Sequence, residues 1–352
     1  MRIAIISPPW VPVPPVRYGG TEAVIDNLAR GLLAAGHDVL LFATGDSTCP
    51  VPVDWVEPTA RGTTAARPAT ELRHVISAYD SIVEWGADVV HDHTLTGPLY
   101  GQRFGIPIVT TNHGPFDAEL SAVYRVLAPD VPVIAISRHQ ASTAPERSVA
   151  TVIHHGVDVD SFPLGDGAGG YALFLGRMCA DKGVHTAARI ARAARVPLKI
   201  AAKIHEPEER RYFDEQVAPL LGDGIEFVGE VGGRTKLDLL ANASCLLNPI
   251  AWPEPFGMVM IEALACGTPV LTTPCGSAPE IVDDGVTGFI RPTETDLADM
   301  LSRVHTLDRR ACRKAAAERF STERMVEQHV ALYQRVVSGH TETPPTRIAA
   351  VA

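Results

Sequence analysis

The sequence predicts an α/β fold with two parallel-sheet domains that face one another across a cleft. Short apolar runs alternate with helical patterns from the first residue onward, which is the order of βαβ units with parallel strands. The runs are almost continuously apolar, as expected for strands that helices cover on both faces. A polar, glycine-rich stretch at residues 165–170 separates two such series, so we expect two sheets.

The first series predicts an N-terminal domain of residues 1–164. It opens with the apolar run RIAIIS at residues 2–7 and reaches DVLLFAT at residues 38–44. Between these runs, apolar residues recur with the period of a helix: Val24, Ile25, Leu28, Leu32 and Leu33. The later runs of this half are ADVVH, IPIVTTN, VPVIAIS and ATVIHH.

The second series predicts a C-terminal domain of residues 165–324. Its first residues, GDGAGG, are suited to a flexible linker. They also fit G-x-G-x-x-G, but they precede a strand instead of joining a strand to a helix, so we treat this dinucleotide-binding pattern as accidental. The expected strands are YALFLG, PLKIAA, GIEFVG, SCLLNPI and TPVLTT, and residues 293–338 read as helical.

The composition favours a soluble, folded protein of the cytoplasm. The chain has 352 residues, 46% of them hydrophobic, which is enough for two domains of ordinary size. The formal net charge of −10 argues against nucleic-acid binding, because phosphates need concentrated Lys and Arg. The opening apolar run is too short for a signal peptide, and no later run has the length of a membrane span. Six cysteines without a C-x-x-C pair indicate reduced thiols, while peripheral membrane contact stays open.

Two cations follow the first strand of the second series. Arg177 comes directly after YALFLG, and Lys182 lies just ahead of a helical pattern. Ligands of open α/β sheets bind beyond the carboxyl ends of the strands, and helix N-termini favour anions. The pair therefore indicates an anion site, although solvated surface cations would give the same pattern. In the first domain, Gly19 and Gly20 end a proline-rich loop and are consistent either with a close backbone approach or with a bare turn.

The segment EPFGMVMIE places a carboxylate at each end of an otherwise uncharged stretch. Flanking prolines keep Glu254 in a loop, and Gly257 precedes a helical run from residue 258 to residue 266. Glu262 then lies within an apolar helix, where a lone carboxylate is costly unless it accepts hydrogen bonds. Hydroxyls of a sugar in the cleft would supply them, and so would an internal bond to backbone or arginine.

Three histidines lie near the ends of strands in the first half. His91 and His93 share one face of a strand, but no third ligand with convincing spacing follows, so a structural role is favoured over a metal site. His113 comes just past the strand IPIVTTN. It is consistent with work in the cleft or with a simple His-Gly-Pro turn.

Together these segments resemble a retaining glycosyltransferase of family 4, also described as glycosyl transferases group 1. The resemblance spans nearly the whole chain: YGGTE, TNHG, ISRHQ, HGVDVDSF, LGRMCADKG, FVGEV, PEPFGMVMIEALACGTPVL and GSAPEIVDDGVTGF. It implies the GT-B fold, in which two Rossmann-like domains face across a cleft. It also implies that the last helix, residues 325–340, crosses back to the N-terminal, acceptor-side domain.

The resemblance assigns roles residue by residue. Arg177 and Lys182 match the basic pair that holds the diphosphate of a sugar nucleotide as it leaves. Glu254 would hydrogen-bond the donor sugar, Glu262 would hold the ribose, and His113 would lie beside the reacting carbon. The remaining donor-binding positions act through their backbone, from both sides of the phosphates: Gly19, Gly20, Phe256, Gly257, Met258 and Val259.

The implied reaction moves a hexosyl group from a nucleotide-diphosphate sugar to a hydroxyl, with retention of configuration and without a metal or other cofactor. UDP is the favoured nucleotide and GDP the next. The acceptor, a small molecule, glycan or lipid-linked sugar, has no recognisable signature between residues 115 and 147, although Phe116, Tyr124 and Arg125 lie there. A sugar-nucleotide epimerase and a non-catalytic sugar-nucleotide-binding protein are the alternatives.

Overall fold

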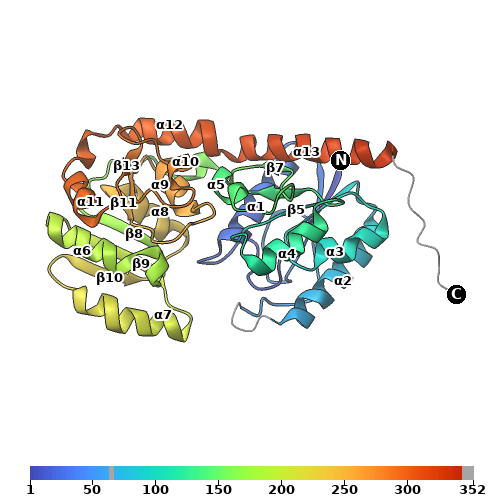
Figure 1. Cartoon of the computed structure of the whole chain (residues 1–352), viewed down its shortest axis with the longest axis horizontal. Helices are drawn as coiled ribbons and strands as arrows, with labels where there is room; N and C mark the ends of the chain where they lie inside the picture. Colours follow the sequence, from blue (N-terminus) through green and yellow to red (C-terminus); the bar gives the residue numbers. More distant parts are fainter. Residues whose placement is uncertain (63–66, 343–352) are drawn as a thin grey trace.

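The computed structural model describes residues 1–62 and 67–342 and contains two parallel sheets, one in each half of the molecule (Figure 1). The first sheet has the order β3-β2-β1-β4-β5-β6-β7, and its paired strands run parallel. Its strands are β1 (Arg2–Ile6), β2 (Asp38–Ala43), β3 (Val53–Trp55), β4 (Val89–Asp92), β5 (Ile108–Thr111), β6 (Val133–Ala135) and β7 (Thr151–Val152). The helices of this half are α1 (Gly20–Ala34), α2 (Pro68–Trp85), α3 (Gly97–Gly101), α4 (Ala118–Leu127) and α5 (Arg138–Ser142).

The second sheet has the order β10-β9-β8-β11-β12-β13 and is parallel in the same way. Its strands are β8 (Ala172–Arg177), β9 (Leu198–Lys203), β10 (Ile225–Gly229), β11 (Cys245–Asn248), β12 (Val270–Thr272) and β13 (Gly288–Ile290). The helices that follow them are α6 (Val184–Ala194), α7 (Pro207–Tyr212), α8 (Gly233–Asn242), α9 (Met258–Ala265), α10 (Ala278–Ile281), α11 (Glu294–Leu301) and α12 (Arg309–Phe320). Two Rossmann-like α/β domains are thus observed, as the sequence predicts.

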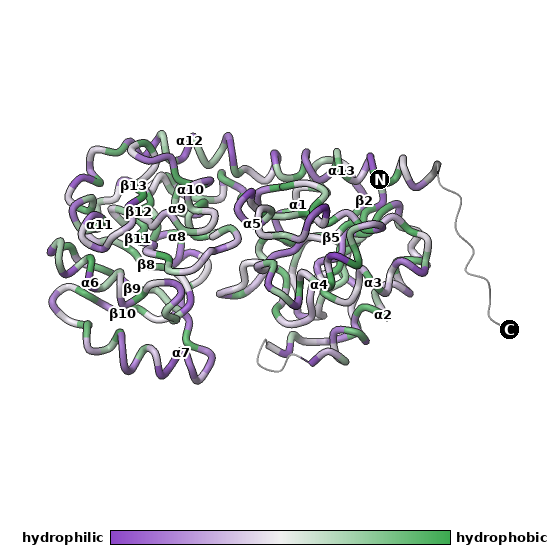
Figure 2. Tube along the Cα trace, in the orientation of Figure 1, coloured by the Kyte–Doolittle hydropathy of each residue, from purple (hydrophilic) through white to green (hydrophobic). Residues whose placement is uncertain are grey.

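The hydropathy of the chain explains these layers. Strands β4, β5 and β11 are buried along their whole length, because helices cover both faces of each sheet. Figure 2 shows hydrophobic segments inside each half and hydrophilic ones at outer helices such as α7. No helix in the described part of the chain is long and apolar enough to cross a membrane.

The last helix, α13 (Thr322–Glu342), runs from the second half along the first (Figure 1). Between α12 and α13 the chain makes a bridge to the segment after β7: Val157 N–H donates to Phe320 O at 2.9 Å, and Thr322 N–H donates to Val157 O at 3.0 Å. Beyond this point Met325 and Tyr333 are buried in the same cluster as the core residues of β1 and α1. A methyl group at Gly31 of α1 would lie only 2.5 Å from a methyl of Val326, so α1 and α13 are in close contact.

The glycine-rich segment at residues 165–170 is hydrogen-bonded into the second half and not a free linker. Gly165 N–H donates to Cys266 O at 3.0 Å, and the Arg309 side chain donates to Gly165 O at 2.7 Å. The sequence prediction of a flexible stretch therefore misses partners that lie far away in the chain. The domain limits 1–164 and 165–324 remain a division made from the sequence.

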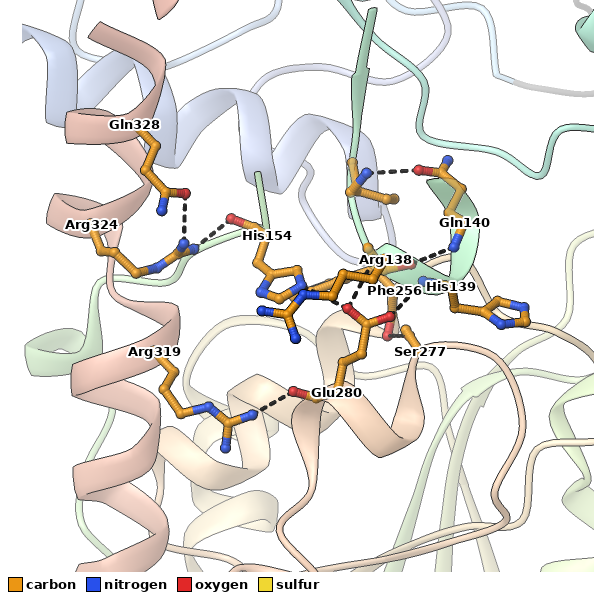
Figure 3. Close-up of polar contacts among 12 residues, drawn as sticks. Arg138, His139, Gln140, His154, Phe256, Ser277, Glu280, Arg319, Arg324 and Gln328 are labelled. Carbon is orange, nitrogen blue, oxygen red and sulfur yellow. Dashed lines mark hydrogen bonds and ion pairs between the residues drawn. The ribbon is translucent and has the colours of Figure 1, made fainter. Parts of the chain in front are cut away.

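The carboxylate of Glu280 in α10 fastens the two halves together (Figure 3). It accepts hydrogen bonds from the backbone N–H groups of Arg138, at 2.8 Å, and of His139, at 2.6 Å, in the first turn of α5. His154 Nε2 lies 3.0 Å from the same carboxylate. Burial alone would raise the pKa of Glu280, but these hydrogen bonds outweigh burial and hold the pKa below its ordinary value.

The backbone around this carboxylate is held from α12 and α13. Arg319 donates to the carbonyl of Glu280, and Arg324 donates to His154 O at 2.6 Å. Figure 3 shows Arg319 of α12 and Arg324 of α13 at one side and α5 at the other, with Glu280 between them. Side chains from both halves and the crossing helix therefore share one polar cluster.

Replacing this carboxylate should weaken the contact between the halves. Glu280→Gln keeps the shape but loses the charge that two backbone N–H groups and His154 bind, so we expect it to lower the free energy of unfolding by about 1–3 kcal/mol. Urea unfolding at neutral pH measures the change. Glu294→Gln is the matched control, because the ion pair of Glu294 with Arg189 is nearly half exposed and should contribute at most about 1 kcal/mol. Equal losses in both variants would contradict the role of Glu280.

Candidate functional site

The site lies where the two sheets reverse their strand order. In the first sheet the order reverses between β1 and β4, and in the second between β8 and β11. Ligands of open α/β sheets bind beyond the strand ends at such switch points. A cleft of about 1160 Å³ is lined from both halves by the segments that follow β1, β8 and β11.

The structure brings all the residues selected as catalytic or donor-binding to this cleft. The lining includes the residues chosen as catalytic, which are Arg177, Lys182, Glu254 and His113. It also includes the residues chosen for donor binding, which are Gly19, Gly20, Phe256, Gly257, Met258, Val259 and Glu262.

The basic pair meets Glu254 at the ends of β8 and β11. Lys182 Nζ donates to Glu254 Oε2 and forms an ion pair with it, and Trp252 Nε1 donates to the same oxygen at 2.9 Å. The Arg177 guanidinium has no hydrogen-bonded partner among the described residues. Burial alone would lower the pKa of Arg177, but nearby groups that include Tyr18, Glu209 and Glu254 outweigh burial and raise the pKa. Arg177 is thus a partly buried cation whose donors are free to bind an anion.

The N-terminus of α9 lies at the same wall of the cleft as Arg177 and Lys182. Gly257 is the residue before the helix and has φ 90°, a left-handed conformation in which a side chain is strained; a methyl group there would also lie 2.6 Å from Met260 Cε. The Phe256 side chain is buried and lies edge-on to the His155 ring, with 5.1 Å between centroids. The side chain thus anchors the loop, while the first turn of α9 offers N–H groups to an anion.

Glu262 lies in the second turn of α9 and is 8% exposed. Its carboxylate accepts from Lys236 Nζ of α8 at 2.8 Å. The burial cost of the carboxylate is therefore offset by a lysine, which is neither of the internal partners considered from the sequence. Both side chains line the cleft.

From the first half, the loop before α1 crosses to the second. Tyr18 N–H donates to Glu230 Oε1 at 3.3 Å, and Arg17 lies 3.6 Å from the other oxygen of the same carboxylate. Lys203 Nζ lies 5.5 Å from the centre of the Tyr18 ring and pairs with Glu209 at 3.5 Å. A methyl group at Gly19 would lie 2.6 Å from Pro15 Cβ, so this glycine is required by close packing.

Behind the cleft the histidines form two hydrogen-bonded groups, which meet where the rings of His91 and His93 lie 4.0 Å apart between centroids. His113 Nε2 lies 2.8 Å from His93 Nδ1. His91 joins Tyr333 of α13 through Nδ1 at 2.7 Å and Thr111 through Nε2 at 2.8 Å. Burial lowers the pKa of His113 to about 4, so it is neutral at physiological pH. Among residues 1–62 and 67–342, no group of three or more His, Cys, Asp or Glu side chains is arranged to hold a metal ion.

Two aromatic residues of the segment expected to meet the acceptor lie away from the cleft. Phe116 and Tyr124 are buried and pack edge to face, with 5.4 Å between ring centroids, and neither lines the cleft. Sequence reasoning did not select Glu22 and Asp26 of α1, which do line it. Their spacing of four residues, on a helix whose other buried positions are apolar, was the available signal.

Glu22 is a buried carboxylate without a cation. It is 7% exposed, and no other described residue donates a hydrogen bond to its side chain. Burial raises its pKa to about 7, although its own backbone N–H works in the opposite direction. A buried carboxylate with a raised pKa in a cleft wall is a candidate for contact with a ligand.

Both halves of the chain match family models of glycosyltransferases. Residues 18–161 match the family model described as Glycosyltransferase Family 4, and residues 169–307 match the model described as Glycosyl transferases group 1. The chain is 30% identical to a phosphatidyl-myo-inositol mannosyltransferase of Mycolicibacterium smegmatis over 326 residues, which cover 84% of this chain and 81% of the relative. It is 27% identical to a D-inositol 3-phosphate glycosyltransferase of the same organism, over 73% of this chain and 69% of the relative.

Among solved structures, the chain resembles AviGT4, a glycosyltransferase involved in avilamycin A biosynthesis. The TM-score is 0.72 and the identity 27%, with 96% of this chain and 98% of the other covered.

The raised pKa of Glu22 predicts how stability depends on pH. The ordinary pKa of a glutamate is near 4.5, and in the folded protein the pKa of Glu22 is about 7. Between these two pH values the folded state keeps a proton that the unfolded state releases. The free energy of unfolding therefore falls progressively as the pH rises through this window. Above pH 7 the penalty is complete and amounts to about 3 kcal/mol. Glu22→Gln removes it, so we expect the variant to be the more stable protein at pH 8 and close to the wild type at pH 4.5.

Urea unfolding at the two pH values measures this difference. Glu84→Gln, the same change at an exposed position of α2, is the control and should leave both values unchanged. A Glu22→Gln variant that gains no stability between pH 4.5 and pH 8 would show that the carboxylate is solvated in the protein.

Proposed function

The chain belongs to glycosyltransferase family 4, and from that premise we propose that it transfers a hexosyl group from a nucleotide-diphosphate sugar to an acceptor hydroxyl with retention of configuration. It is a glycosyltransferase with the GT-B fold. A UDP-sugar is the first donor that we propose, because it is the most frequent donor in the family, and a GDP-sugar is the second.

The meeting of Arg177, Lys182 and the N-terminus of α9 at one wall of the cleft is the observation that supports this proposal most directly. The two cations follow β8, and the helix follows β11, its neighbour in the sheet. A diphosphate at this wall would receive charge-assisted hydrogen bonds from Arg177 and Lys182 and backbone bonds from residues 257–259.

Transfer then depends on the charge that grows on the leaving diphosphate. As the bond between the anomeric carbon and oxygen breaks, Arg177, Lys182 and the helix dipole of α9 stabilise the developing negative charge. Lys182 pairs with Glu254 in the structure, and a diphosphate would compete for its ammonium group. Glu254 is then available to accept hydrogen bonds from hydroxyls of the donor sugar.

Retention follows if the acceptor attacks from the face that the diphosphate leaves. The leaving phosphate then takes the proton of the acceptor hydroxyl, and neither Glu254 nor Glu262 acts as a covalent nucleophile. Glu262 instead accepts from the ribose, and neutral His113 lies beside the donor sugar. The reaction as proposed needs no metal or other cofactor.

An epimerase or a non-catalytic sugar-nucleotide-binding protein are the competing functions. An epimerase would return an altered sugar nucleotide and need no acceptor. A binding protein would hold the donor without cleaving it. Both halves match family models of glycosyltransferases, which favours transfer over either alternative.

A donor screen tests the proposal without knowledge of the acceptor. We expect UDP-sugars to raise the melting temperature and to be hydrolysed slowly to free sugar and UDP, with GDP- and ADP-sugars weaker. NMR of the released sugar follows the reaction, and a parallel series with EDTA should show the same rates. Binding without hydrolysis would favour a non-catalytic protein, and a changed sugar nucleotide would favour an epimerase.

Loss of either cation should reduce turnover far more than stability. Arg177→Ala or Lys182→Ala removes one cation that would bind the leaving diphosphate. We therefore expect either variant to lower kcat/KM for the donor by about 10²–10³-fold. Steady-state donor hydrolysis measures the loss, and melting temperatures report folding. Arg189→Ala is the control, because this exposed arginine of α6 forms an ion pair with Glu294 and does not line the cleft. Unchanged activity in both cation variants would refute the diphosphate site.

A further inference from the structure

One carboxylate oxygen in the cleft receives hydrogen bonds from two different side chains. Glu254 Oε2 accepts from Lys182 Nζ and, at 2.9 Å, from Trp252 Nε1. The other oxygen, Oε1, has no hydrogen-bonded partner in the described part of the chain and is not buried. All three residues line the cleft, so a ligand there can reach the free oxygen.

The two donors differ in how a diphosphate would act on them. The Lys182 ammonium group is a point charge on a flexible stem, and it lies 5.6 Å from the centre of the Trp252 ring. An anion attracts this charge directly. The indole N–H is a neutral donor with one direction, and it carries no charge for an anion to compete for. A diphosphate would therefore draw Lys182 away from Glu254 and leave the bond from Trp252.

The segment that carries the indole and the carboxylate is held by its own backbone. At one end, Ala251 N–H donates to Asp181 O at 2.9 Å. At the other end, Ser277 N–H donates to Glu254 O at 3.0 Å, and a methyl group at Gly276 would overlap with backbone atoms of Glu254. The position of this segment therefore does not depend on the lysine side chain.

Burial makes the second donor necessary once the lysine has moved. The side chains of Lys182 and Glu254 are only 14% and 13% exposed. A carboxylate that loses its cation in such a place is costly unless another donor stays bonded to it. The Trp252 N–H is that donor, because its bond to Oε2 is independent of the ion pair.

We propose that Trp252 is a positioning residue that holds Glu254 ready for the donor sugar while Lys182 changes its partner from Glu254 to the diphosphate. This inference rests on the proposed function and adds a residue to it. Before the donor binds, Lys182 and Trp252 share Oε2. Afterwards Trp252 alone holds Oε2, and Oε1 accepts from a sugar hydroxyl.

This exchange links recognition of the two parts of the donor. The diphosphate removes the lysine from the carboxylate, and only then does the full accepting capacity of Glu254 serve the sugar. Without the indole N–H, the carboxylate would either keep Lys182 or turn away from the sugar. A tryptophan that only filled the wall of the cleft would need its ring but not its N–H.

Trp252→Phe separates these two roles, because it keeps an aromatic ring and removes the N–H. We expect it to lower kcat for donor hydrolysis by about 10-fold and to leave the affinity for UDP, which has no sugar to position, within about twofold. In a Glu254→Ala background the same change should cause no further loss, because the two residues act as a unit. Trp85→Phe is the control, since Trp85 also carries a cation over its ring, Arg2 at 4.5 Å, but does not line the cleft.

A spectroscopic measurement follows the exchange without relying on activity. The chain has four tryptophans, and the indole N–H signal of Trp252 in a ¹⁵N-correlated NMR spectrum is the one that Trp252→Phe lacks. We expect UDP to shift this signal, because Lys182 leaves the shared oxygen. Exchange of the indole proton with deuterium should stay slow in the presence of UDP and become faster in Glu254→Ala.

The outcomes separate this inference from the proposed function. If the wild type hydrolyses no sugar nucleotide, the proposed function fails, and the indole signal alone decides the role of Trp252. The inference is overturned, with the proposed function intact, if Trp252→Phe hydrolyses the donor at the wild-type rate or if its loss adds in full to that of Glu254→Ala. It is also overturned if UDP leaves the indole signal unchanged or makes its proton exchange fast.

Discussion

The arrangement of the whole molecule depends on one carboxylate that is shared between its halves. Glu280 belongs to the second half, but it satisfies the first N–H groups of α5, which otherwise lack intrahelical partners. Because those groups and the carboxylate would each be costly to bury alone, the contact fixes the direction in which the halves approach. The arginines from α12 and α13 then hold the flanking backbone in place.

With the halves fixed in this way, the two places where the sheets reverse their strand order lie at the same cleft. Each half lines the cleft with side chains from the segments that follow its own strands. The second half supplies Arg177 and Lys182 with a helix N-terminus, while the first supplies the carboxylates of α1 and a neutral histidine. The two walls of the cleft therefore differ in the charge of their side chains. The wall formed by the second half favours anions, and the opposite wall offers hydrogen-bond acceptors.

Much of this could be predicted from the sequence, because the signals were local. The buried strands gave the fold, and the segment from Glu254 to Glu262 with the basic pair gave the family, both of which are confirmed. What could not be predicted were partners distant in the chain. Lys236 is 26 residues from Glu262, and Gly165 is held by Arg309, which no local pattern reveals. The burial of Phe116 likewise depends on tertiary packing.

The crossing of α13 also affects the order in which the protein can be made. The core around β1 and α1 includes Met325 and Tyr333, which follow the second half in the sequence. A ribosome makes these residues only after the complete second half. We therefore expect apolar side chains of α1 to stay uncovered until α13 has been made, so that the half translated first is the last to become native.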